Sequence, residues 1–187
     1  MANENIDLSS IFSEIGDVMK QTDLSKVSAE STGFEDLPDG YYLAEVIETK
    51  IGRSKSSQKP MISLRLSVID DGFKLSDNED EISFDKIEHT KGRQVFKHYV
   101  IDTPQNLKRF VSDMKKFENP DVVGEALLPD EAWSSPEFMG ESIGILSEIN
   151  CRIWIHNRVT KKDDGTSSSW VDLVSFNQAA KAGLPVD

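Results

Sequence analysis

The residues best placed for chemistry lie in one short stretch, Ile149 to Val159, whose character alternates from one residue to the next. One side of the alternation carries Cys151, Ile153, Ile155 and Val159, and the other carries Arg152, Trp154, His156 and Arg158. A period of two predicts a half-buried β-strand. A strand face made only of cations and aromatic rings favours an anionic, planar ligand, and single-stranded nucleic acid has both properties.

The same stretch has a simpler interpretation. Another segment of the chain would cover Trp154, and the arginines would be ordinary charges on an edge strand. The stretch alone does not separate the two interpretations, so the distribution of charge along the rest of the chain becomes important.

That distribution is uneven. The chain has 187 residues and a formal net charge of −12, which at first argues against nucleic acid. Three stretches nevertheless contain no Asp or Glu, namely Thr49 to Ile69, His89 to Ile101 and Ile149 to Lys162. They hold 12 of the 21 Lys and Arg residues and all 3 His residues. We therefore expect a basic face on an acidic body, with chance clustering on solvated strands as the alternative.

The candidate nucleic-acid-binding residues come from these three stretches and combine cations with rings. They are Arg53, Lys55, Lys59, Arg65, Arg93, Lys97, Tyr99, Arg152, Trp154, His156 and Arg158. The cations would neutralise phosphates, while Trp154, Tyr99 and Phe96 would stack bases at ~1 to 3 kcal/mol each. Because every base has a face to stack, we expect little sequence preference.

The elements that must position these residues are five strands, with a helix between the third and the fourth. The expected strands are Tyr41 to Ile51, Met61 to Asp70, Arg93 to Ile101, Ile149 to Val159 and Trp170 to Phe176. Between the third and fourth strands, Thr103 and Pro104 begin a helix, and a short second helix runs from Ser135 to Ile145. This mainly β order is that of the OB-fold, a five-stranded Greek-key barrel whose binding surface lies between two loops. Here those loops are Gly52 to Pro60 and Thr160 to Ser169, in or beside the acid-free stretches.

Three flanking segments complete the expected organisation. An apolar stripe from Leu8 to Met19, with Asn5 or Asp7 as its cap, predicts an amphipathic helix that packs on the domain, pairs with a second copy or docks a partner. A Ser-rich linker follows from Thr22 to Thr32, and the acidic stretch from Phe73 to Glu88 is expected to be a solvated loop. The expected division is a helix and linker (1–33), an OB-fold domain (34–180) and a short tail (181–187).

Other function classes have little support in the sequence. It has no Walker-type phosphate loop, no His and Cys pairing for a metal and no nucleophile signature, so we expect neither enzyme activity nor a cofactor. A single cysteine suits a reducing compartment. The N-terminal residues lack a secretory pattern, and no apolar run approaches the ~18 residues of a membrane span. We therefore expect a cytoplasmic protein that does not contact a membrane.

Several short motifs resemble a family of phage proteins encoded beside recombination and replication genes. They are Leu37-Pro38-Asp39-Gly40-Tyr41, Lys59-Pro60-Met61-Ile62-Ser63-Leu64, Val68-Ile69-Asp70-Asp71-Gly72, and Arg93-Gln94-Val95-Phe96 ahead of Leu107-Lys108-Arg109-Phe110. The resemblance spans Phe34 to Phe176 and implies an OB-fold that binds single-stranded DNA in phage replication or recombination, in the host cytoplasm. Such proteins often end in an acidic tail that recruits partners, whereas this chain ends Leu184-Pro185-Val186-Asp187. The N-terminal helix is then the better candidate site for a replication or recombination partner, or for a second copy.

The main alternative to DNA binding is an acidic protein-binding module. The net charge of −12 would let such a module imitate nucleic acid and inhibit a basic host protein. Its helix from Leu8 to Met19 would offer a docking ridge.

Overall fold

The fold is described from a computed structural model, which describes residues 8–21, 36–76 and 82–186. Contacts divide the chain into two units, Met1–Asp36 and Leu37–Asp187. The first unit contains α1 (Leu8–Gln21), at the position that the apolar stripe predicts. The proposed caps Asn5 and Asp7 and the linker from Thr22 to Thr32 lie outside the described residues.

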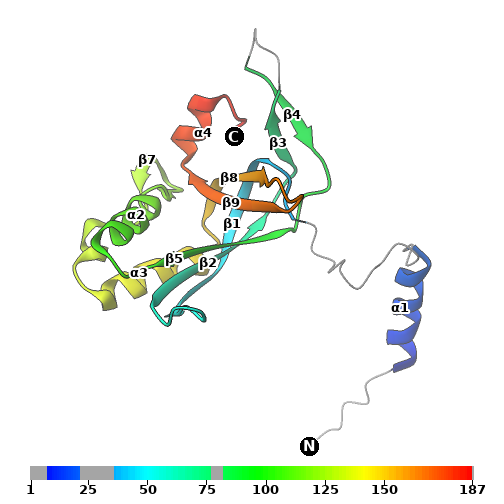
Figure 1. Cartoon of the computed structure of the whole chain (residues 1–187), viewed down its shortest axis with the longest axis horizontal. Helices are drawn as coiled ribbons and strands as arrows, with labels where there is room; N and C mark the ends of the chain where they lie inside the picture. The colour runs from blue at the N-terminus through cyan, green and yellow to red at the C-terminus, as the bar shows by residue number, and fades with distance from the viewer. Residues whose placement is uncertain (1–7, 22–35, 77–81, 187) are drawn as a thin grey trace, which may run out of the picture. The chain divides into compact units, whose positions relative to one another are not determined.

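The second unit is organised around the long strand β1 (Gly40–Arg53), which the turn from Leu37 precedes as expected. Its first half pairs antiparallel with β8 (Arg152–Lys161), and its second half pairs antiparallel with β2 (Pro60–Val68). β2 continues the sheet to β5 (Gln94–Val100), and β8 continues it to β9 (Ser167–Val174). The five strands thus lie in the order β9-β8-β1-β2-β5 (Figure 1).

The structure confirms a mainly β domain with helical additions, but its sheet is not closed into a barrel. Among the described strands, β5 and β9 stand at the two ends of that order and share no backbone ladder. The main core lies on one face of the sheet, because alternate residues of β1, β2 and β8 point to the same side. Its members include Tyr42, Val46, Leu64, Leu66, Ile153 and Ile155.

The chain between β5 and β8 forms two α-helices, as the sequence predicts. α2 (Pro104–Met114) begins at Thr103, whose hydroxyl accepts a hydrogen bond from the backbone N–H of Asn106 at 3.2 Å. α3 (Pro136–Glu148) begins at Ser135 in the same way. Between them lie two short strands, β6 (Glu118–Asn119) and β7 (Val122–Ala126), and a 3-10 turn, Asp130–Trp133. The α2 stripe of Phe110 and Met114 is fully buried in the main core.

The acidic stretch from Phe73 to Glu88 contains regular structure, so its prediction as a solvated loop is wrong in part. β3 (Gly72–Leu75) and β4 (Phe84–Ile87) form an antiparallel hairpin whose first strand pairs with β1 (Figure 1). A Cβ on Gly72 would lie 2.1 Å from the Tyr42 ring, so only glycine allows this approach. The acidic residues 77–81 lie outside the described residues.

The last helix, α4 (Phe176–Ala182), lies over the face of the sheet opposite the main core (Figure 1). A capping box between Ser175 and Gln178 begins it, and Gly183 ends it in the left-handed conformation at φ 87°. Together with the β3-β4 hairpin it encloses a second apolar cluster around Trp154, Ala179 and Leu184. Leu184, in the expected tail, therefore packs with the rest of the second unit.

Candidate nucleic-acid interface

The structure shows which face of strand β5 is buried, a question that its mixed sequence does not answer. Val95 and Tyr99 face the main core, whereas Gln94, Phe96 and His98 are exposed on the opposite face. Phe96 is 54% exposed, and its ring is nearly parallel to that of His98, with centroids 6.1 Å apart and planes 10° apart. The structure thus presents two adjacent aromatic surfaces on an edge strand.

Arg65 lies beside these rings on the neighbouring strand, since it is the register partner of Phe96. Its Nε donates a hydrogen bond to Gln94 Oε1 at 2.9 Å, and its guanidinium lies 3.4 Å from the Glu48 carboxylate. Two residues along each strand, Ser63 and His98 are also register partners, and Ser63 Oγ and His98 Nδ1 share a hydrogen bond of 2.8 Å. These polar contacts fix the side chains on the outer face of β2 and β5.

The basic loop between β1 and β2 is a tight turn. Ser54 is buried and Gln58 takes a positive φ of 56°, so the loop has a defined path. Arg53 donates a hydrogen bond to the Gln58 carbonyl at 2.9 Å, and Lys59 forms an ion pair with Asp102. Lys55 is exposed and forms no ion pair within the described part of the chain. The three cations therefore differ in how available they are to a ligand.

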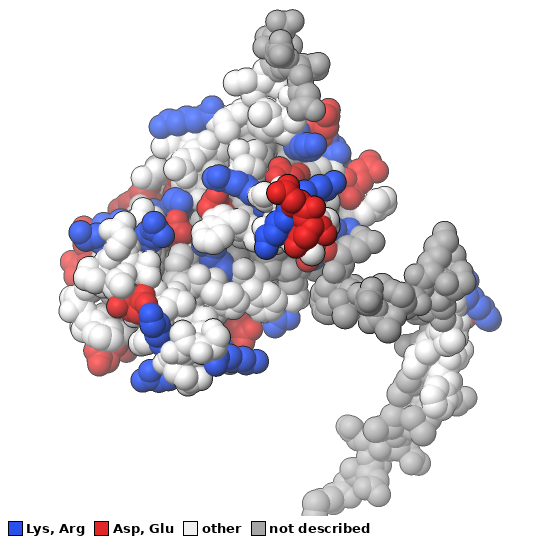
Figure 2. All heavy atoms as spheres, in the orientation of Figure 1, with Lys and Arg blue, Asp and Glu red and all other residues white. Residues whose placement is uncertain are grey.

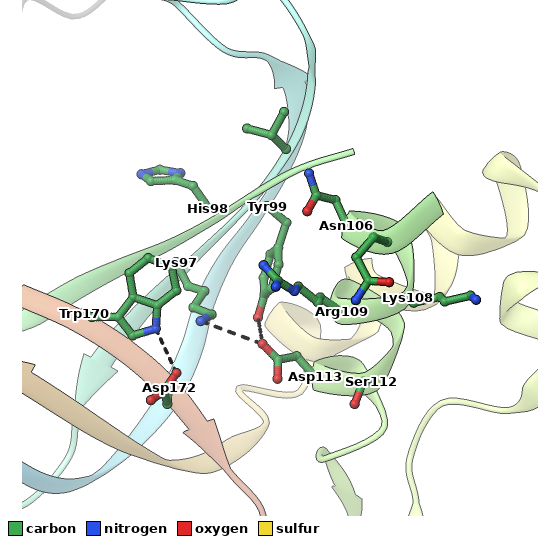
Figure 3. A pocket seen from close by; sticks show the side chains of 12 residues that line it. Lys97, His98, Tyr99, Asn106, Lys108, Arg109, Ser112, Asp113, Trp170 and Asp172 are labelled. Carbon is green, nitrogen blue, oxygen red and sulfur yellow. Dashed lines mark hydrogen bonds and ion pairs between the residues drawn. The ribbon is translucent and has the colours of Figure 1, made fainter. Parts of the chain in front are cut away.

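Where β5 approaches β9, the structure has a cleft of about 690 Å³ between the open ends of the sheet and α2. Its lining comes from β5, α2 and β9 and includes Lys97, Tyr99, Arg109, Asp113, Trp170 and Asp172 (Figure 3). Trp170 is 65% exposed, and its Nε1 donates a hydrogen bond to Asp172 at 2.8 Å. The cleft thus combines an accessible indole ring with groups of both charge signs.

Lys97 faces this cleft and not the outer surface that carries Arg65, because the two are on opposite faces of the sheet. Its Nζ lies 3.7 Å from Asp113, 5.3 Å from the centre of the Trp170 ring and 5.4 Å from that of Tyr99. Burial lowers the pKa of Lys97, and the carboxylates of Asp113 and Asp172 oppose that effect. Lys97 thus contributes to the cleft mainly through internal contacts.

Tyr99 does not offer a free ring, which corrects the expectation that it stacks a base. It is 8% exposed, and its hydroxyl donates a hydrogen bond to Asp113 at 2.8 Å. Its ring packs edge to face on Phe110 of α2, with centroids 5.1 Å apart. Burial raises the pKa of Tyr99, and the adjacent Asp113 carboxylate adds to the shift.

Trp154 is the clearest difference from the expected interface. The alternation of β8 correctly groups it with Arg152, His156 and Arg158, but α4 and the β3-β4 hairpin cover this part of the face. Trp154 is 2% exposed, and its Nε1 has no hydrogen-bond partner among the described residues. The simpler interpretation, in which another segment covers the ring, is the correct one for Trp154.

Of the remaining predicted residues on β8, His156 and Arg158 have partners within the second unit. His156 stacks on Tyr41 with ring centres 4.1 Å apart, and burial lowers its pKa. Arg158 forms an ion pair with Asp172 at 2.6 Å. Arg152 is exposed opposite Glu45 of β1. β8 therefore does not provide the continuous binding track that its sequence predicts.

The predicted set is thus only partly gathered. Arg65 lies on the outer face of the sheet, Arg53, Lys55 and Lys59 lie in or beside the first loop, and half-exposed Arg93 directly precedes β5. The predicted set does not include Trp170 or His98, although the alternation around Leu173 indicates which side of β9 is exposed.

Figure 2 shows Lys and Arg atoms scattered over one face of the molecule, with Asp and Glu atoms among them. That face does not show the single basic field expected from the acid-free stretches.

Other kinds of site find no support in the described residues. Within residues 8–21, 36–76 and 82–186, no group of three or more His, Cys, Asp or Glu side chains could hold a metal ion. In the same ranges, no helix is both long enough and apolar enough to cross a bilayer. No protein-family model matches the chain, and no curated protein matches it either.

Proposed function

We propose that residues 37–187 form an OB-fold domain that binds single-stranded DNA without catalysis. The strand order supports this proposal, because β9-β8-β1-β2-β5 is the order of a five-stranded Greek-key barrel opened between its third and fifth strands. The position of α2 and α3 between β5 and β8 agrees with that topology. Lys97 of β5 donates a hydrogen bond to the Val171 carbonyl of β9, at the position where backbone hydrogen bonds between these two strands would close a barrel.

The observation that carries the binding proposal is the pair of exposed rings on β5. In an OB-fold the second and third strands form the ligand face, and here these strands are β2 and β5. Phe96 and His98 offer planar surfaces to bases, and Arg65 lies next to them with its guanidinium on the same face. These rings replace Trp154 and Tyr99 in the binding role.

Basic loops extend this surface at both ends. Arg53 ends β1 and Lys55 follows in the β1-β2 connection, while exposed Lys161 ends β8 and exposed Lys162 follows in the β8-β9 connection. Both connections flank the ligand face of an OB-fold. Their cations would neutralise phosphates along the strand, with affinity that falls as salt rises. From the resemblance of the sequence motifs to phage proteins, we propose that this binding serves DNA replication or recombination.

The test is a titration of the full chain into fluorescein-labelled oligo-dT, followed by anisotropy at two salt concentrations. Phe96→Ala is expected to weaken binding roughly tenfold, because one stacked base is worth ~1 to 3 kcal/mol. Phe138→Ala is the matched control, since Phe138 is equally exposed at 57% but lies on α3. Failure of the wild-type protein to bind oligo-dT at low salt would defeat the proposal.

A second candidate function, protein docking, is favoured by α1. Phe12, Ile15 and Met19 are 65%, 48% and 55% exposed, at the spacing of one helix face. A second copy or a replication or recombination protein would cover this face. Sedimentation of the wild-type protein and of Phe12→Glu tests self-association; a concentration-independent monomer would exclude the second copy.

A further inference from the structure

The cleft between β5 and β9 is lined by residues that have no role in the proposed stacking of bases on Phe96 and His98. Its walls are the exposed Trp170 on one side and helix α2 on the other (Figure 3). We propose that this cleft holds one nucleotide of the bound strand, with its base against Trp170 and its phosphate at Arg109. This inference rests on the proposed function, since it assigns a nucleotide position within the same bound strand.

The periodicity of α2 explains why polar groups line the cleft. Phe110 and Met114 are buried in the main core and Val111 packs against it, whereas residues at the complementary positions line the cleft, namely Gln105, Lys108, Arg109 and Ser112. A helix presents residues at these spacings on one face. The amphipathic helix therefore turns donors toward the space in front of Trp170.

Among the described residues that line the cleft, two exposed cations, Arg109 and Lys108, form no ion pair and are available to an anion. Asp172 is engaged by Arg158 at 2.6 Å and by Trp170, and Asp113 is engaged by Lys116 at 2.7 Å and by Tyr99. Lys97 is mostly enclosed, with 11% of its side chain exposed. Arg109 is exposed and forms no ion pair within the described part of the chain, and in Figure 3 it extends toward the cleft, whereas Lys108 points away from Trp170.

Trp170 is oriented for stacking. The hydrogen bond from its Nε1 to Asp172 fixes the plane of the indole, and the Lys97 ammonium lies near its ring. More than half of the side chain, 65%, stays accessible. A fixed, exposed indole costs little conformational entropy on stacking, and a neighbouring guanidinium supplies a bidentate partner for phosphate.

The experiment compares variants of the full chain by anisotropy with labelled oligo-dT across a salt series. Trp170→Ala is expected to weaken binding roughly tenfold with an unchanged salt slope, and Trp170→Phe is expected to restore most of the affinity because it restores a ring. Arg109→Ala is expected to weaken binding and to reduce the salt slope by about 0.7, the value for one phosphate contact on a single strand. Lys181→Ala, an exposed lysine of α4 outside the cleft lining, is the control, with an expected loss of less than about twofold.

The outcomes separate the inference from the proposal on which it rests. If wild-type protein binds oligo-dT but Trp170→Ala binds equally well, or if Arg109→Ala and Lys181→Ala have the same effect, the cleft is not a nucleotide site. If dTMP alone quenches tryptophan fluorescence at the concentrations at which oligo-dT does, the cleft is a site for free nucleotides and the assignment to a strand is wrong. If wild-type protein does not bind oligo-dT at all, the proposed function itself fails.

Discussion

The Nζ of Lys97 on β5 donates a hydrogen bond to the carbonyl oxygen of Val171 on β9, at 2.5 Å. These strands share no backbone ladder, so a side chain connects the two ends of the described five-strand order. The same ammonium approaches Asp113 of α2 at 3.7 Å. Lys97 therefore links three elements that meet at the cleft.

Replacement of Lys97 by methionine tests the importance of this link. Lys97→Met keeps an unbranched side chain but removes the donor, so the Val171 carbonyl loses a partner and Asp113 loses one of its cations. We expect a loss of roughly 1 to 3 kcal/mol in the free energy of unfolding, measured with urea. Lys91→Met, at an exposed turn position, should change it by less than about 0.5 kcal/mol. Equal stability of the two variants would contradict the structural role of Lys97.

Two tryptophans provide a second stability test because their burial differs. Trp154→Ala should cost about 3 to 5 kcal/mol, since the ring is 2% exposed within the cluster that α4 covers. Trp170→Ala, at 65% exposure, should cost at most about 1 kcal/mol through its contacts with Lys97 and Asp172. Urea unfolding of both variants measures the difference. Similar losses would show that α4 does not shield Trp154.

The contrast between these residues shows what the sequence could predict. Alternation in β8 correctly separates Ile153 and Ile155 from Trp154, because strand periodicity is a local property. It does not reveal which side of a strand meets solvent, since that depends on segments distant in the chain. The cover over Trp154 comes from the seven-residue α4 and from Leu184, which have only a weak apolar pattern.

Strand β5 was harder to interpret for a related reason. Both of its faces mix polar and aromatic residues, so the burial of Tyr99 and the exposure of Phe96 depend on the position of α2. The capping signals at Thr103 and Ser135 were reliable because they act within one helical turn. Ion pairs across strands, such as that of Arg158 with Asp172, depend on strand register and are not encoded in a local sequence pattern.

Alkaline pH should destabilise the fold. Burial raises the pKa of Cys151 from 9.0 to about 11 and that of Tyr42 from 10.0 to about 12. Above pH 9 the unfolded chain therefore releases protons that the folded chain retains, and the free energy of unfolding falls as pH rises. We expect the urea midpoint to decrease from pH 9 upward.

Cys151→Ala isolates the first part of this decline. Between pH 9 and pH 10 the thiol titrates in the unfolded state before the tyrosines do, so the variant should lose stability less steeply than the wild type in that interval. Above pH 10 both proteins should decline, because Tyr42 is intact in each. A wild-type midpoint that does not change from pH 9 to pH 11 would contradict the burial of these groups.

A final prediction concerns Asp172, whose carboxylate lies in the proposed nucleotide cleft. Asp172→Asn retains an oxygen that accepts the hydrogen bond from Trp170 Nε1, while it removes a negative charge from the cleft assigned to an anionic nucleotide. It also releases Arg158 from an ion pair. Affinity for oligo-dT should therefore increase severalfold at low salt, opposite in sign to the effect of Arg109→Ala. Asp121→Asn, an exposed residue outside the cleft lining, makes the same change in net charge and should alter affinity only slightly. Anisotropy compares the two variants, and equal affinities would mean that total charge, not the cleft, controls binding.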